Sequence, residues 1–312
     1  MMSDTSAIST SPAGGPADAP PGEPPKRIGL VVHPSRSVDQ PLRLVREWSE
    51  EHSVELFQVP AAYSQRRVAE QDELGQSDLI VSIGGDGTTL AALRSAAVAK
   101  RPVLGIACGS LGALATVAVP DVTRSLERFS RGEWQPRRFP ALSVTPGEGD
   151  PLFALNDVAV IRAGGGQVRV SARVDGSLYA RTAGDGALVS TAIGSSGYAI
   201  SAGGPLLAGG LNAFVLTPLP KHGGFSPPLV IGPNSTLELE VGAGFGGARL
   251  EVDGQVAGER VRLLTICLRE GVATMVSFPD QETLLAGLRR RRIVLDSPRV
   301  AVDDARGAAG CP

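Results

Sequence analysis

The sequence is poor in cysteine, in aromatic residues and in net charge. Its 312 residues include three cysteines and 4% aromatic residues, and 30 basic side chains face 32 acidic ones, for a net charge of -2. Cys108, Cys267 and Cys311 form no Cys-x-x-Cys pair, which argues against a disulfide framework or a cysteine-rich zinc site and favours a reducing compartment. The balanced charge lacks the basic excess of nucleic-acid-binding proteins.

Long hydrophobic runs are also missing. No stretch reaches the roughly 18 uncharged apolar residues that a membrane helix needs, and the N-terminus has no basic flank followed by a hydrophobic signal core. We therefore expect a cytoplasmic protein with neither a membrane nor a nucleic acid as its partner.

The residues that serve metal and hydrolase chemistry are sparse as well. His33, His52 and His222 are scattered without metal-ligand spacing, so we expect no metal site built from side chains. Ser195 lies in Gly-Ser-Ser-Gly and lacks the Gly-x-Ser-x-Gly spacing of the hydrolase elbow. Trp48 and Trp134 do not alternate with basic residues, so no stacking platform for single strands is predicted.

Residues 27–136 alternate short apolar runs with helical segments. The Ser-, Pro- and Gly-rich residues 1–26 have little to bury and predict a disordered tail. The runs that follow predict strands at Ile28–Val32, Val54–Phe57, Asp78–Ile83 and Val103–Ile106, and helices at Leu42–Glu50 and Thr88–Val98. This alternation predicts an α/β domain with a parallel, Rossmann-like sheet, which binds ligands at the carboxyl ends of its strands.

The pattern changes after about Pro136 to short β-rich stretches. Gly, Pro and Asp separate them, which predicts a mainly β domain over residues 137–275. The expected strands are Ala141–Val144, Leu155–Ile161, Val168–Val174, Ala187–Ser190, Ala213–Leu216, Leu237–Val241, Arg249–Val252 and Val261–Leu268.

The C-terminal residues predict one further helix and a second tail. We expect residues 276–296 to pack back on the N-terminal domain, with an amphipathic helix at Gln281–Arg292, and residues 297–312 to be frayed. The basic run Arg289–Arg292 is interpreted as a solvated helix end in preference to a contact with an anionic ligand.

The strand-turn-helix unit Ile83–Thr89 is the strongest local signal. Its glycines allow backbone N–H groups to converge on phosphate oxygens at a helix N-terminus. The carboxylate of Asp86 would repel a phosphate unless it binds a metal or accepts a proton from an attacking hydroxyl. An aspartate has the second role in phosphoryl transfer. Asp86 as a helix cap is an equally open alternative on this motif alone.

Two further polar segments could serve a nucleotide. The segment Asp185–Pro205 offers hydroxyls, bare backbone N–H groups and the flat ring of Tyr198. The pair Asn156-Asp157 could bind a base edge and a ribose hydroxyl. The alternatives are a glycine-rich connector for the first segment and a simple turn for the second.

Taken in chain order, these segments resemble the NAD kinase family, within the broader group that holds the diacylglycerol and sphingosine kinases. The likeness runs from about Ile28 to Phe278. The matching motifs are Gly84–Thr88, Asn156-Asp157, Gly184–Tyr198, Ser201–Pro205 and Asp253-Gly254-Gln255.

The resemblance implies phosphorylation of the 2'-hydroxyl of the adenosine ribose of NAD by ATP or polyphosphate, giving NADP, with Mg²⁺ or another divalent cation accompanying ATP. It implies Asp86 as the general base and a dimer or tetramer as the assembly. The implied phosphate-binding residues are Gly84, Gly85, Gly87 and Thr88, and the implied NAD-binding residues are Asn156, Asp157, Asp185, Ser196, Gly197, Tyr198, Ser201 and Gln255.

Several positions depart from the family pattern. Ala107 stands for an Asn and Ala192-Ile193 for Pro-Thr, which removes polar groups that could meet the ligand, and Asp157 stands for a Glu, which shortens the side chain by one methylene. Two alternatives therefore stay open beside the NAD kinase hypothesis: a kinase for another nucleoside or dinucleotide, and a non-catalytic NAD-binding sensor. A lipid kinase is a third alternative. It predicts an exposed apolar entrance for an acyl chain, and no stretch of the sequence indicates one.

Overall fold

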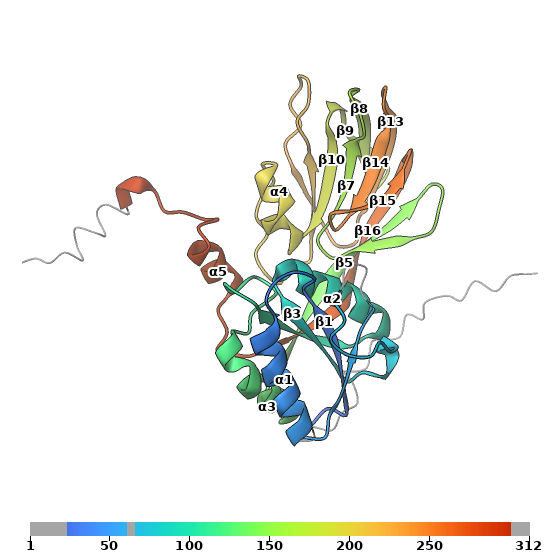
Figure 1. The fold of residues 1–312 in the computed structure, drawn as a ribbon. Coiled ribbons are helices and arrows are strands. Elements are labelled where there is room, and N and C mark those ends of the chain that lie inside the picture. Colours follow the sequence, from blue (N-terminus) through green and yellow to red (C-terminus); the bar gives the residue numbers. More distant parts are fainter. Residues whose placement is uncertain (1–23, 61–65, 301–312) are drawn as a thin grey trace, which may run out of the picture.

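The computed structural model describes residues 24–60 and 66–300. In Figure 1 a lower α/β part carries an upper part made mainly of β-strands. The tail predictions for residues 1–23 and 301–312, and Cys311 with them, lie outside the described residues. Lys26 is already part of the fold, since its backbone N–H donates to Asp78 Oδ2 at 2.7 Å.

The N-terminal part is a parallel sheet in the order β2-β1-β3-β4. It confirms the predicted α/β class, and it adds one helix, α3, that the sequence analysis did not predict. The elements are β1 (Arg27–Val32), α1 (Asp39–Glu51), β2 (Glu55–Gln58), β3 (Leu79–Gly84), α2 (Asp86–Ala99), β4 (Pro102–Ala107) and α3 (Val122–Ser130), with two 3₁₀ turns at Leu74–Gln76 and Val119–Asp121.

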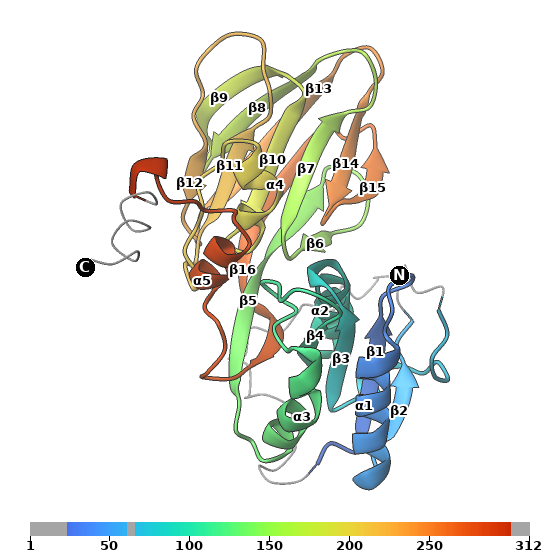
Figure 2. The same cartoon turned by 60° about the vertical axis from the view of Figure 1, so that its left-hand side comes forward.

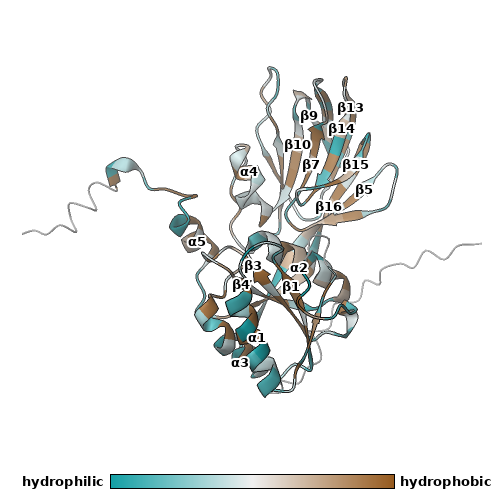
Figure 3. Ribbon diagram, viewed as in Figure 1, coloured by the Kyte–Doolittle hydropathy of each residue, from teal (hydrophilic) through white to brown (hydrophobic). Residues whose placement is uncertain are grey.

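Helices cover both faces of this sheet (Figure 2). Alternate strand residues point to opposite faces, so Leu30 and Val81 pack with α1 and α3, whereas Val31 and Ile80 pack with α2. The outer surface of α1 is hydrophilic in Figure 3, and the helix buries Trp48 against the sheet. Both faces of the strands are thus apolar, as expected of a parallel sheet.

The C-terminal part is a β-sandwich, which confirms the predicted mainly β class. Its inner faces share one core of Val, Leu, Ile, Ala and Phe side chains. One sheet has the order β12-β11-β10-β7-β14-β15. The strands are β5 (Gln135–Pro146), β6 (Leu152–Ala154), β7 (Asp157–Arg162), β8 (Val168–Val174), β9 (Ser177–Gly184), β10 (Gly186–Thr191), β11 (Phe214–Pro218), β12 (Leu229–Ile231), β13 (Thr236–Ala243), β14 (Ala248–Val252), β15 (Gln255–Glu259) and β16 (Leu263–Ser277), and between β10 and β11 lie the 3₁₀ turn η3 (Gly194–Ser196) and the short helix α4 (Tyr198–Ser201).

Strand β16 joins the two parts into one sheet. It pairs in parallel with β4 at Thr274 and Met275, and it pairs antiparallel with β5 and β13. The strand predicted at Val261–Leu268 is therefore too short, because the chain passes an irregularity between Arg269 and Ala273 and continues to Ser277. A shared strand fixes how the N-terminal sheet meets the sandwich.

The chain after β16 returns to the N-terminal part. Val276 and Phe278 pack in the α1/α3 core, and the side-chain amide of Gln281 donates to Thr116 Oγ1 at 3.1 Å. The helix predicted at Gln281–Arg292 is shorter, α5 (Leu284–Arg290), and begins at Thr283, whose hydroxyl accepts from the Ala286 N–H. Within residues 24–60 and 66–300, none of the helices combines the length and apolarity needed to span a bilayer.

Candidate active site

The turn between β3 and α2 presents the N-terminus of a fourteen-residue helix. Gly84 ends the buried strand, Gly85 is the N-cap residue and Asp86 is the first residue of the helix. A side chain at Gly84 would collide with that of Thr88, so only glycine allows this tight passage from strand to helix. The free N–H groups of the first turn favour an anion at this point.

The carboxylate of Asp86 turns away from its own helix. It accepts hydrogen bonds from the backbone N–H groups of three consecutive residues, Ala113, Leu114 and Ala115, at 2.9, 2.8 and 3.0 Å. Gly112 faces it so closely that a Cβ would overlap the carboxylate. The alternative that Asp86 caps its own helix is therefore wrong. Its carboxylate binds the backbone of the loop after β4 instead.

A cavity of about 480 Å³ opens in front of this turn. It brings together four of the predicted residues, Gly85, Asp86, Gly87 and Thr88, and two cationic side chains, Arg36 and Arg291. The remaining lining residues are Val31, Val32, His33, Pro34, Ala91, Ser110, Leu111 and Gly112.

The two arginines come from opposite ends of the chain. Arg36 lies in the loop after β1, where His33 Nδ1 accepts from the backbone N–H groups of Ser35 and Arg36 at 3.2 and 3.0 Å. Arg291 ends α5, and its Nη1 lies 3.3 Å from Asp86 Oδ2. The solvated-end interpretation of the basic run is thus wrong for Arg291, while Arg289 and Arg290 pair with surface carboxylates.

A third arginine contacts the loop that binds Asp86. Arg137 Nη1 donates to the Ala113 carbonyl at 3.2 Å. Burial lowers the pKa of the Arg137 guanidinium, and the nearby Asp86 carboxylate partly offsets this effect. Arg137 and Arg291 thus place positive charge near Asp86, which suits an anionic ligand at the helix N-terminus.

Asp253 organises the start of β7, where the predicted pair Asn156-Asp157 lies. Its side chain is 1% exposed and accepts the backbone N–H groups of Leu155, Asn156 and Asp157 at 3.1, 2.7 and 3.1 Å. Arg94 of α2 pairs with it at 3.0 Å. Arg94 follows Asp86 by eight residues, about 12 Å along the helix, so α2 links the glycine turn to the Asn156-Asp157 segment.

Two buried polar side chains of this region could contact a polar ligand. The side-chain Asn156 Oδ1 and the Ser190 hydroxyl are buried, and neither has a hydrogen-bond partner within the part of the chain that the structure describes. Ser190 pairs with Asp157 across the β7–β10 ladder. Burial raises the pKa of Asp157 to about 7, with the Asp253 and Glu251 carboxylates adding to the shift. Buried polar atoms of this kind pair with an ordered water or a bound group, so Asn156 and Ser190 fit a polar ligand at this segment.

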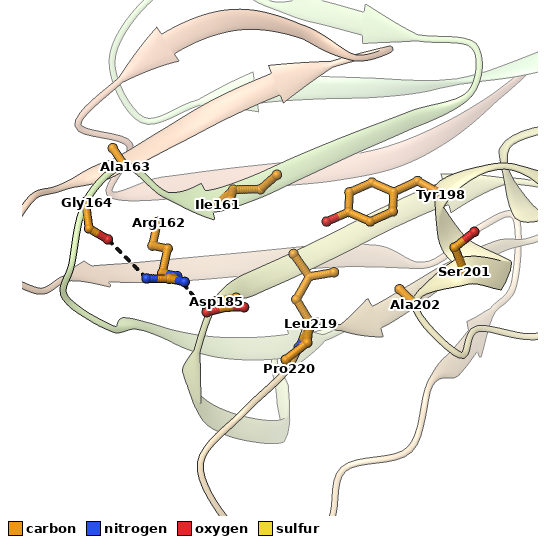
Figure 4. A pocket seen from close by; sticks show the side chains of 10 residues that line it. All are labelled: Ile161, Arg162, Ala163, Gly164, Asp185, Tyr198, Ser201, Ala202, Leu219 and Pro220. Carbon is orange, nitrogen blue, oxygen red and sulfur yellow. Dashed lines mark hydrogen bonds and ion pairs between the residues drawn. The ribbon is translucent and has the colours of Figure 1, made fainter.

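A second cavity, of about 440 Å³, gathers three predicted residues from the 185–205 segment. Figure 4 shows Asp185, the Tyr198 ring and Ser201 around it. Arg162 closes one side, with its Nε 2.7 Å from Asp185 Oδ1. Burial raises the pKa of the Tyr198 hydroxyl, and the Glu251 carboxylate adds to this effect. Tyr198 is 44% exposed, so its side chain is accessible to a ligand.

Other predicted residues lie outside both cavities. Ser196 donates its hydroxyl to the Ile193 carbonyl at 2.9 Å, and Gly197 is the N-cap residue of α4. Gln255 begins β15, two residues after Asp253. No group of three or more His, Cys, Asp or Glu side chains that could hold a metal occurs in residues 24–60 and 66–300.

Four residues of these sites were not singled out from the sequence: Arg36, Arg162, Asp253 and Arg291. Asp253 carried a signal, because it opens the Asp-Gly-Gln motif from which only Gln255 was selected. Arg291 carried one as well, because the basic run Arg289–Arg292 offered contact with an anionic ligand as the alternative to a solvated helix end. Arg36 and Arg162 carried none, since nothing near them in the sequence marks the cavities that they line.

Two family descriptions match the chain and together span most of the described residues. The ATP-NAD kinase N-terminal domain matches residues 28–134, and the ATP-NAD kinase C-terminal domain matches residues 155–266. An NAD kinase of Heliobacterium modesticaldum is 35% identical over 242 residues, which cover 73% of this chain and 84% of that protein. The chain belongs to the NAD kinase family. This family member is therefore a phosphotransferase.

Further relatives and solved structures agree. NAD kinase 1 of Streptomyces avermitilis is 30% identical over 276 residues, covering 74% of this chain and 77% of that protein. An Archaeoglobus fulgidus NAD kinase in complex with ATP is 27% identical, with a TM-score of 0.67 over 84% of this chain and 96% of that one. Yeast NADH kinase complexed with NADH, at 18% identity and a TM-score of 0.71 over 88% and 89% of the chains, supports the fold of this family member.

Proposed function

We propose that the protein transfers the terminal phosphoryl group of ATP to the 2'-hydroxyl of the adenosine ribose of NAD, giving NADP, with Asp86 as the general base. The observation that carries this proposal is the position of the Asp86 carboxylate. It lies at a helix N-terminus, in a cavity that also holds Arg36 and Arg291. A carboxylate among anion-binding groups fits a site where a hydroxyl must lose its proton to a phosphate.

The chemistry requires activation and alignment. A ribose hydroxyl is a weak nucleophile, so a base within hydrogen-bond reach contributes by accepting its proton in the transition state. The backbone N–H groups of the α2 N-terminus and the guanidinium groups stabilise the charge on the phosphoryl oxygens. Gly84 permits the tight turn, while Gly85, Gly87 and Thr88 line the path of the donor phosphates.

The acceptor side rests on the C-terminal part. Asn156, Asp157 and Tyr198 supply an amide, a carboxyl group and a ring face that suit a ribose and a base. Asn156 Oδ1 is buried and has no hydrogen-bond partner among the described residues, which supports this assignment. The other residues of the proposed NAD subsite are Asp185, Ser196, Gly197, Ser201 and Gln255.

The donor is proposed to be Mg-ATP, with the divalent ion arriving on the triphosphate, and polyphosphate is a second donor to be tested. The proposed assembly is a dimer or tetramer, as the resemblance implies. Size-exclusion chromatography with light scattering measures the assembly directly, and a monomeric mass at micromolar concentration would contradict it.

The test of the function is incubation of the purified full chain with Mg-ATP and NAD, with NADP detected by a NADP-specific dehydrogenase. Parallel reactions contain NADH as the acceptor or polyphosphate as the donor. We expect NADP from Mg-ATP and NAD. Absence of NADP from every donor, with NAD binding intact by calorimetry, would contradict the proposal and favour a sensor.

A further inference from the structure

The acceptor positions of the Asp86 carboxylate are all occupied. Its Oδ1 accepts the N–H groups of Leu114 and Ala115, and its Oδ2 accepts the N–H of Ala113 and lies 3.3 Å from Arg291 Nη1. A carboxylate offers about four such positions. A substrate hydroxyl can therefore reach Asp86 only if one of these four donors leaves.

Three of the four donors are fixed by the fold. The loop that carries them is tied to β4, because the Thr116 and Val117 N–H groups donate to the Gly105 carbonyl at 3.1 and 2.9 Å. Arg137 holds the Ala113 carbonyl in addition. The backbone N–H groups of this loop cannot leave Asp86 without disrupting the turn at the end of β4.

The fourth donor is a side chain that can move. Arg291 follows the seven-residue helix α5, its side chain is 22% exposed, and its contact with Asp86 is the longest of the four. Leu288, which is fully buried, and the bond from Arg290 to the Leu111 carbonyl hold the helix beside the cavity. Arg291 Nε also donates to the Gly287 carbonyl of α5 at 3.2 Å, so Nη1 can change partner by a movement of the guanidinium group while α5 stays in place.

The geometry points to Arg291 as a binding residue for the terminal phosphate of the donor, which draws it away from Asp86. This inference rests on the proposed function. The attacking hydroxyl must lie about 3 Å from both Asp86 and the phosphorus, so a guanidinium at Asp86 Oδ2 is within reach of the transferring group. Arginine binds phosphate oxygens through two parallel N–H groups.

Movement of Arg291 makes the accessibility of Asp86 depend on donor binding. Once Arg291 binds the phosphate, Asp86 Oδ2 is open to the 2'-hydroxyl. The hydroxyl oxygen then bonds to the terminal phosphorus, its proton passes to Asp86 Oδ2, and the bond from phosphorus to the bridging oxygen breaks with its electron pair leaving on ADP. Donor binding should consequently strengthen acceptor binding, because the hydrogen bond from the hydroxyl to Asp86 becomes available.

The test compares Arg291→Gln with Arg292→Gln. Both variants lose one positive charge, but Arg292 is exposed and does not line the cavity. Calorimetry on the full chain measures the Kd of Mg-AMP-PNP and of Mg-ADP, which lacks the terminal phosphate. For Arg291→Gln we expect Mg-AMP-PNP binding to weaken about tenfold or more and Mg-ADP binding to change less than about twofold. Arg292→Gln should leave both unchanged, and Arg291→Lys should give an intermediate loss.

A second readout separates binding from a structural role. In the unmodified protein Mg-AMP-PNP should tighten NAD binding, whereas in Arg291→Gln NAD should bind equally with and without it, because Asp86 is already open. An unchanged Kd for Mg-AMP-PNP in Arg291→Gln would overturn the inference. An equal loss for Mg-ADP would also overturn it, since it indicates a general effect of α5. These Kd values test the role of Arg291 whether or not NADP forms. Failure of the proposed function would instead appear as a lack of NADP formation.

Discussion

Arg94 on α2 forms an ion pair with the buried side chain of Asp253 in the β14–β15 turn, with 3.0 Å between Arg94 Nη1 and Asp253 Oδ2. The Asp253 carboxylate also accepts hydrogen bonds from three backbone N–H groups at the start of β7. The helix that begins at the glycine turn is thus bonded to the segment that carries Asn156 and Asp157. The proposed donor and acceptor residues share one rigid connection.

Replacing Asp253 with Asn should destabilise the protein by about 3 kcal/mol, because the amide N–H₂ group faces backbone donors and Arg94 loses its partner. Urea unfolding measures the loss. Asp175→Asn is the matched control: this residue also has positive φ in a β-turn and accepts one backbone N–H, but it is exposed. Equal stability losses in the two variants would contradict the role given to Asp253.

Asp157 should make stability depend on pH. Its pKa of about 7 in the folded protein exceeds the unfolded value of about 3.9, so the folded state holds the proton more tightly. The free energy of unfolding should therefore fall as pH rises from about 4 to about 7, by roughly 4 kcal/mol from this group, and then level off. Asp157→Asn should remove this component, so that the variant gains stability relative to the unmodified protein with rising pH. A stability difference that is constant between pH 4 and pH 8 would contradict the raised pKa.

Replacing Gly87 with Ala should raise stability and weaken donor binding. A Cβ at this second residue of α2 would meet no atom within 4 Å, and the position lines the cavity at Asp86. Gly87→Ala should stabilise the protein by about 0.5–1 kcal/mol and weaken Mg-AMP-PNP binding, because the methyl group occupies phosphate space. Thermal unfolding and calorimetry measure the two effects. Donor binding as tight as in the unmodified protein would show that the phosphates do not pass Gly87.

The sequence predicted elements wherever the signal was local. Ile83–Thr89 has the apolar run, glycines and helix-forming residues that make β3 and α2, and the structure has both. The helix α3 was missed although Val122, Leu126 and Phe129 are spaced for one buried face, because its nine residues were too short to stand out. The end of β16 was missed because Glu270-Gly271 looks like a turn, whereas here it makes an irregularity within one long strand.

The site was predictable only in part, for a physical reason. Asp86 was identified from the residues around it, but its partner Arg291 is 205 positions away and comes close only through the return of the chain after β16. Asp253 likewise acts on backbone groups nearly 100 residues earlier. Contacts of this kind depend on strand order and register, which no short motif encodes.

The most direct test of the central claim is the rate of NADP formation from Mg-ATP and NAD by Asp86→Asn beside the unmodified protein. Asparagine keeps the size of the side chain and cannot accept the hydroxyl proton, so kcat should fall about 100-fold or more. The amide N–H₂ group would face at least one of the backbone N–H donors of residues 113–115, so this variant should also be less stable. Calorimetric Kd values for NAD and Mg-AMP-PNP within about threefold of those of the unmodified protein would show that its binding sites are still folded. NADP formation by Asp86→Asn at the unmodified rate would contradict Asp86 as the base.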